Sequence, residues 1–195
     1  MIYDITQPVF ECVVFPGDPA PKKETLKETA KGDVCNLTAF SMCAHNGTHV
    51  DAPFHFLQDG KRLNEVALEK FIGKAYVAKK DGEVSAEDAK TILSMAKEAD
   101  SECWKKILIK GKATITEEAA MVFAEAKIDL VGNDSQTVGP ENAPKKVHLI
   151  LLGAEIVLLE GTRLDKVPEG VYTLNCAPIN LGSVDGAPCR AILMD

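Results

Sequence analysis

The chain has 195 residues, of which 46% are hydrophobic and 26% are charged, and its formal net charge is −7. This length suits one domain spanning residues 1–195, and the composition excludes an intrinsically disordered chain. The acidic balance argues against a nucleic-acid partner, which requires a basic surface. No apolar run approaches the roughly 18 residues of a membrane span, so no membrane partner is expected.

The first residues, up to Pro19, contain neither a basic start nor a long apolar stretch. No signal peptide is therefore expected, and the cytoplasm is the predicted location. Six cysteines are scattered along the chain without a CxxC motif. In a cytoplasmic protein, such cysteines are expected to be free thiols and mostly buried.

The first part of the chain is expected to contain short strands and turns. The Pro-Gly-Asp-Pro run at Pro16–Pro19 predicts a turn through its residue chemistry, as does the polar run at Gln58–Lys61. The other expected elements are strands at Ile2–Ile5, Leu37–Met42 and Lys74–Lys79, and a short helical segment at Leu63–Phe71.

Helices and strands alternate from Ser85 onwards. Ser85 with an acidic residue three places later resembles a capping box, and apolar residues then recur at helical spacing. Lys106–Ile109 is expected to form a buried strand, and Ile128–Val131 the next strand. Between them, Thr116 is expected to be the N-cap of a helix that ends at Ala126. A strand, a helix and a strand at this spacing form a right-handed βαβ unit.

The last quarter of the chain is strongly apolar. Val147–Leu152 and Glu155–Glu160 are apolar segments on either side of Gly153. Together they could form a strand, then a short helix or turn, then a second strand. The residues alone leave this assignment open. The tail from Val171 onwards contains two strand candidates joined by Gly, Asp and Pro. The whole pattern predicts a single mixed α/β domain with a substantial sheet.

A cluster of metal-ligand residue types stands out near the end of the first quarter. His45, His49, Asp51 and His55 fall within eleven positions, and three of the four histidines of the chain are among them. Two imidazoles and a carboxylate are a usual ligand set for zinc, manganese or iron, with positions left open for water. A single histidine is more often an ordinary core or surface residue, but four such residues together favour a metal site.

The spacing within this cluster also suits one ion. His49 and Asp51 would lie on the same face of an extended segment, because alternate side chains of a strand share a face. Gly47 would let the backbone turn tightly and bring His45 back toward His49. Pro53 would end any regular hydrogen-bonded run and present His55 from a loop.

Two later residues carry weaker signals. Glu160 ends an apolar run, where an acid is costly unless it is paired, solvated or bound to a metal. By themselves, both His148 and Glu160 would be interpreted as surface residues at strand ends. No GxSxG motif supports a serine hydrolase, and neither GxGxxG nor GxxxxGK[ST] supports a nucleotide site.

The segment HNGTHVDAPFHF at residues 45–56 resembles the HxGTHxDxPxH signature of the cyclase-like metal hydrolases, the family of bacterial kynurenine formamidase and isatin hydrolase. Other parts of the chain resemble the same family. They are the aromatic-Pro-Gly-Asp turn at Phe15–Pro19 and the strand and polar loop at Lys127–Ser135. The segment that begins with His148 and ends with Glu160, and the closing strand at Gly186–Ala191, also match. The resemblance thus covers nearly the whole chain.

The resemblance implies a role for each site residue. It implies that His45 and His49 bind a first metal ion, that His148 holds a second, and that both carboxylates, Asp51 and Glu160, bridge the two. It implies that His55 is the proton donor and acceptor. It also implies two Zn²⁺ per chain, with Mn²⁺ as an alternative, a swivelling, barrel-like sheet with flanking helices, and a homodimer or homotetramer.

Hydrolysis of a C–N amide bond follows, since a divalent ion activates water and an imidazole can move the proton. An aryl formamide such as N-formylkynurenine is the expected small-molecule substrate. Phe15 stands where the formamidases carry a substrate-contacting Trp, so it is a candidate wall for a flat ring; it could equally pack the turn against the core. Gly161-Thr162-Arg163-Leu164 also departs from the formamidase pattern. A cyclic amide or lactone substrate, or a non-catalytic metal-binding protein, therefore stays an alternative.

Overall fold

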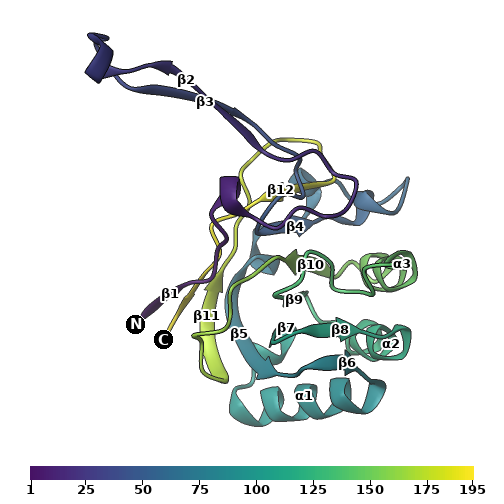
Figure 1. The fold of residues 1–195 in the computed structure, drawn as a ribbon. Coiled ribbons are helices and arrows are strands. Elements are labelled where there is room, and N and C mark those ends of the chain that lie inside the picture. Colours follow the sequence, from purple (N-terminus) through teal and green to yellow (C-terminus); the bar gives the residue numbers. More distant parts are fainter.

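A curled, nine-stranded sheet organises residues 1–195, all of which are described by the computed structural model (Figure 1). Its four central strands, β5, β7, β9 and β10, run parallel to one another, and the flanking strands pair antiparallel. In spatial order the strands are β1 (Ile2–Asp4), β13 (Ile192–Met194), β11 (Gly170–Asn175), β5 (Ile72–Lys79), β7 (Lys106–Lys110), β9 (Leu130–Asn133), β10 (Val157–Glu160), β4 (His49–Asp51) and β12 (Gly186–Pro188).

Three helices lie on one side of this sheet: α1 (Ala86–Ala99), α2 (Glu117–Ala126) and α3 (Lys145–Gly153) (Figure 1). The hydroxyl of Ser85 accepts a hydrogen bond from the backbone N–H of Asp88 at the start of α1. Thr116 caps α2 in the same way, through the N–H of Ala119. Both predicted N-caps are therefore confirmed, and so is the βαβ unit formed by β7, α2 and β9.

The central strands are buried on both faces. In β7, Ile107 and Ile109 pack in the core beneath the helices, whereas Leu108 enters a second core on the opposite face. Alternate side chains of a strand point to opposite faces, so a strand covered on both sides is apolar throughout. The flanking antiparallel strands close the second core. The predicted class, a single α/β domain with a barrel-like sheet and flanking helices, is confirmed.

Two expectations for the last quarter need correction. Val147–Leu152 is not a strand but the body of α3, because β9 and β10 are parallel and the chain between them has to cross back over the sheet. Leu151 and Leu152 of this helix are fully buried. The tail contains three strands rather than two, since β12 and β13 are separate.

The strand expected at Leu37–Met42 is confirmed as β3 (Leu37–Ser41), whereas its partner β2 (Lys22–Lys27) was not predicted. The hairpin that they form extends away from the body of the protein (Figure 1). A small parallel pair is formed by β6 (Gly82–Val84) and β8 (Ala113–Ile115). The expected helical segment at Leu63–Phe71 consists of two 3-10 turns. No helix in the structure combines the length and the apolar character that crossing a bilayer requires.

Candidate metal centre

Two of the predicted ligands lie on one short strand. His49 and Asp51 begin and end β4, and their side chains share one face of it. β4 is enclosed between β10 and β12, so that His49 is 1% exposed and Asp51 is fully buried. Gly47, just before the strand, has a φ of +69°, a left-handed conformation that glycine adopts without strain.

Sheet register and a crossover helix bring two later residues to the same place. Glu160 is the last residue of β10 and lies opposite His49 in the antiparallel ladder. His148 lies on α3, the crossover between β9 and β10, and both side chains are buried. The interpretation of His148 and Glu160 as surface residues at strand ends is therefore wrong, because tertiary contacts cover both.

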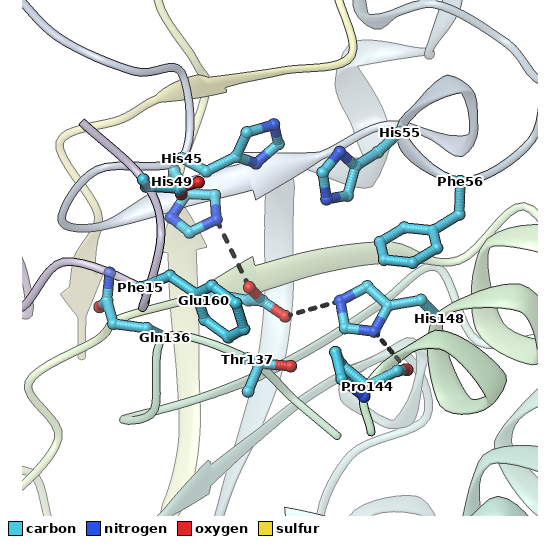
Figure 2. A pocket seen from close by; sticks show the side chains of 11 residues that line it. Phe15, His45, His49, His55, Phe56, Gln136, Thr137, Pro144, His148 and Glu160 are labelled. Atoms are coloured by element: carbon cyan, nitrogen blue, oxygen red, sulfur yellow. Dashed lines mark hydrogen bonds and ion pairs between the residues drawn. The ribbon is translucent and has the colours of Figure 1, made fainter. Parts of the chain in front are cut away.

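The distances between these four side chains suit ligands of a shared cation. Nε2 of His49 lies 3.4 Å from Asp51 Oδ1 and 3.4 Å from Glu160 Oε2. Nε2 of His148 lies 3.3 Å from Glu160 Oε1 (Figure 2). The same atom lies 3.8 Å from Asp51 Oδ2. Two ligand atoms that are each about 2.1 Å from a tetrahedral ion lie about 3.4 Å apart. Each carboxylate thus turns one oxygen toward each histidine, which gives two donor sets, one around His49 and one around His148. In the set around His49, the three ligand atoms all lie within 4.8 Å of one another.

Three further observations show that these residues fit divalent cations. Oδ2 of Asp51 is buried without a hydrogen-bond partner, a costly state for a carboxylate oxygen that a cation would relieve. Nδ1 of His49 donates to the carbonyl of Gly47 at 3.0 Å, and Nδ1 of His148 donates to that of Pro144 at 2.9 Å. With these hydrogens on Nδ1, it is Nε2 of each ring that would lose its proton and turn a lone pair toward a bound cation.

His45 faces the same centre with Nδ1, whereas His49 and His148 face it with Nε2. Its Nδ1 lies 2.9 Å from Asp51 Oδ1, and its Nε2 lies 2.8 Å from Oδ2 of Asp185. A carboxylate behind a metal-binding imidazole is a common supporting arrangement, because it fixes the ring and raises its basicity. Asp185 was not predicted as a site residue, because its segment was expected only to join two strands. The one signal in the sequence is its position directly before Gly186, where the segment that resembles the closing strand of the family begins. In the structure, a Cβ at Gly186 would lie 2.8 Å from the ring of His45.

His55 stands at the edge of this centre. It ends the 3-10 turn Pro53–His55, its ring stacks on His45 with centroids 4.0 Å apart, and its Nδ1 lies 3.3 Å from Asp185 Oδ2. Its side chain is 26% exposed. A nitrogen of His55 lies within 4.8 Å of ligand atoms of His45 and Asp51, yet no carboxylate of the two donor sets is within ion-pair distance of it. This position suits a group that exchanges a proton beside the ligands.

A cavity of about 220 Å³ opens in front of these side chains, with Phe15 and Phe56 on its walls (Figure 2). The turn at Pro16–Pro19 is confirmed by a hydrogen bond from the N–H of Asp18 to the carbonyl of Phe15. Phe15 therefore reaches the cavity from the N-terminal loop, about 30 positions before the histidine cluster. The full lining is Phe15, Asp18, His45, His49, His55, Phe56, Gln136, Thr137, Pro144, His148 and Glu160.

The carboxylates keep the metal-free histidines protonated. Burial lowers the pKa of His45, but the charges and hydrogen bonds of Asp51 and Asp185 outweigh it and raise that pKa to about 11. The same balance, with Asp51 and Glu160 as the partners, raises the pKa of His49 to about 9. At neutral pH both rings therefore carry protons that an incoming cation must displace.

Cation binding is accordingly expected to release protons and to strengthen as pH rises from 6 toward 9. Neutral imidazole is the ligand form, and its fraction at His49 grows over this interval. Titration of metal-free protein by calorimetry, in buffers of different ionisation enthalpy, measures the protons released. Binding with no proton release at pH 7 would contradict the protonated state of these histidines.

Asp185→Asn is expected to lower activity or metal affinity by roughly 10- to 100-fold, the usual effect of losing a partner behind a ligand. The amide keeps the shape of the carboxylate but removes the charge shared by His45 and His55. Metal content and kcat of this variant separate the two contributions. An unchanged enzyme would show that Asp185 only closes the turn before β12.

Comparisons with known proteins agree with this geometry. The sequence model of a family described as "Putative cyclase" matches residues 3–140. A kynurenine formamidase from Erythrobacter litoralis is 30% identical over 206 residues, covering 100% of this chain and 94% of the relative. A solved structure, described as that of a predicted metal-dependent hydrolase from Bacillus stearothermophilus, is 27% identical with a TM-score of 0.81, covering 99% of this chain and 97% of the other.

Isatin hydrolase A from Labrenzia aggregata shares the fold, with a TM-score of 0.82 at 21% identity over 99% of this chain and 93% of the other. The family match covers more than half of the chain, and the formamidase relative aligns along its full length. Both place the histidine cluster inside the region of likeness. The chain belongs to the cyclase family of metal-dependent hydrolases.

Proposed function

We propose that this protein is a metal-dependent amide hydrolase that cleaves the C–N bond of an aryl formamide such as N-formylkynurenine. The observation that carries the proposal is the pair of donor sets in which Asp51 and Glu160 each face both His49 and His148. The full-length likeness to kynurenine formamidase supports the substrate class. Two ions per chain follow from two donor sets, and imidazole with carboxylate ligands favours Zn²⁺ over Mn²⁺.

A divalent ion bound there would lower the pKa of water toward neutrality and polarise the substrate carbonyl. The chain supplies the remaining steps. His55 would take the proton released by the attacking water and return it to the leaving aryl amine, because an imidazole can act as a base and then as an acid. Asp185 would hold His55 in place through Nδ1, which leaves Nε2 for the exchange. Phe15 and Phe56 would keep water away from the reacting carbonyl.

The decisive experiment combines metal analysis with a substrate panel. Protein purified without chelator should contain two divalent ions per chain and should hydrolyse N-formylkynurenine, with release of formate. Chelator should abolish turnover, and added Zn²⁺ or Mn²⁺ should restore it. Turnover of isatin or a lactone without turnover of any aryl formamide would replace this proposal with the cyclic-substrate alternative. A bound ion without any turnover would favour a metal-binding protein.

Phe15→Ala is expected to raise KM for an aryl formamide about tenfold while leaving the melting temperature nearly unchanged. Phe15 is half-buried and faces the cavity, so its ring can stack on the flat ring of the substrate. Phe15→Leu, which keeps an apolar side chain and part of its volume without the aromatic face, is the control for packing. A large loss of stability with unchanged KM would instead assign Phe15 to packing of the turn.

A homodimer or homotetramer in the cytoplasm completes the proposal. The β2–β3 hairpin extends from the body, and all of its strand residues except Ala39 are exposed. A lone two-stranded hairpin is marginally stable in water, and contact with a second copy of the chain would stabilise it. Sedimentation analysis tests the assembly: a monomer at micromolar concentration would contradict it.

A further inference from the structure

A second cavity, of about 270 Å³, lies against the metal-side cavity, and Phe15, Gln136 and Thr137 line both. Each cavity alone is smaller than the roughly 300 Å³ at which small-molecule sites usually begin, whereas the two together fall within the usual range. A substrate whose reacting carbonyl lies at the ligands can therefore extend past these three residues.

Thr137 gives an independent sign of a ligand at this junction. The residue is 5% exposed, and its hydroxyl has no hydrogen-bond partner. Buried hydroxyls are normally satisfied, because leaving one unpaired destabilises the fold. The next residue is held in place, since the N–H of Val138 donates to Glu160 Oε1 at 2.8 Å. Figure 2 shows the Thr137 side chain next to Glu160 at the wall of the metal-side cavity, with its oxygen directed to the side of Pro144.

The charges around the two cavities select among substrates. Asp134 and Glu141 line the second cavity, Asp18 lines the first, and no lysine or arginine lines either. The guanidinium of Arg163 is bound to the side-chain oxygen of Gln7 at 2.8 Å and to the carbonyl of Thr162. A carboxylate on the far end of a substrate would therefore meet like charges without a cation to pair with, whereas an ammonium group would be attracted.

We propose that the second cavity is a subsite for the far end of the substrate, that it accepts an aliphatic ammonium tail on an aryl amide, and that the Thr137 hydroxyl hydrogen-bonds the substrate between the two cavities. This proposal rests on the amide-hydrolase function proposed above and narrows its substrate class. It favours a substrate that carries an amine but no carboxylate over an amino acid.

Three aryl formamides with the same scissile bond and the same ortho ketone test the proposal. N-formylkynuramine carries an ammonium tail, the formamide of 2-aminoacetophenone carries only a methyl group, and N-formylkynurenine carries both ammonium and carboxylate. With metal-loaded enzyme, kcat/KM for the ammonium substrate should exceed that for the other two by about fivefold, mainly through KM. Equal values, or a preference for the carboxylate-bearing substrate, would overturn the proposal.

Variants assign the effect to the named residues. Glu141→Gln should reduce the ratio of kcat/KM between the ammonium and methyl substrates, whereas Glu87→Gln, on the distant helix α1, should leave the ratio unchanged. Thr137→Val removes the hydroxyl at nearly constant volume and should raise KM for all three, and Thr137→Ser should restore it. A Thr137→Val enzyme with unchanged KM would exclude the hydroxyl from substrate binding.

Direct binding separates failure of the subsite from failure of the proposed reaction. Kynuramine and 2-aminoacetophenone, the amine products, are titrated into metal-loaded protein by calorimetry. Tighter binding of kynuramine, lost in Glu141→Gln, supports the subsite even if no formamide is hydrolysed, in which case the proposed reaction alone is wrong. Equal affinities would reject the subsite whatever the turnover.

Discussion

His55→Ala is expected to lower kcat by roughly 10²- to 10⁴-fold, the usual contribution of a general acid–base group, while the metal content stays nearly unchanged. The reason is position: His55 lies beside the donor sets, stacked on His45 and bound to Asp185, and it makes no ion pair with Asp51 or Glu160. Steady-state kinetics and metal analysis of the same preparation measure both quantities.

His49→Ala is the matched control, because it removes an imidazole from a donor set and should lose metal and activity together. Added imidazole should partly restore His55→Ala, since a small base can occupy the space that the side chain leaves. If His55→Ala instead loses its metal, His55 is a ligand, and another group must move the proton.

Asp51→Asn is expected to have the largest effect on metal content. Asp51 offers one oxygen to each donor set, so the substitution removes a charged ligand from both at once. The loss of metal affinity should exceed the roughly 10- to 100-fold loss that is typical when a residue supporting a ligand is replaced. Metal analysis should show a fall from two ions per chain to less than one, with activity lost in proportion.

Glu160→Gln, the other shared carboxylate, should behave like Asp51→Asn. Asp59→Asn, an exposed carboxylate on the neighbouring turn, should change nothing. The metal-free forms of these variants should keep the fold, which circular dichroism checks. A metal content of one ion per chain that stays the same in Asp51→Asn and Glu160→Gln would overturn the two-ion proposal.

Local chemistry was sufficient to predict much of the framework. The helices that follow Ser85 and Thr116 begin where hydroxyl side chains can cap them, and both caps form. The spacing of His49 and Asp51 places both side chains on one face of β4, because the alternation of a strand depends only on neighbouring residues. A dense cluster of ligand types needs no tertiary information to be noticed.

Tertiary structure decided what local chemistry leaves open. Val147–Leu152 is apolar enough for either a strand or a helix, and it is a helix because two parallel strands need a crossover between them. That crossover carries His148 to the centre, while strand register sets Glu160 opposite His49. Asp185 lies 130 positions beyond His55, and only the pairing of β12 with β4 makes them neighbours.

Segments of about ten residues were therefore enough to predict the helix starts and the first candidate ligands, and the order of strands and helices along the chain was enough to predict the class of the fold. The complete site depended on contacts between distant segments, whose geometry follows from the order of strands in the sheet. Strand order is set by burying both faces of β7 and its neighbours at once, a property of the whole core rather than of any one segment.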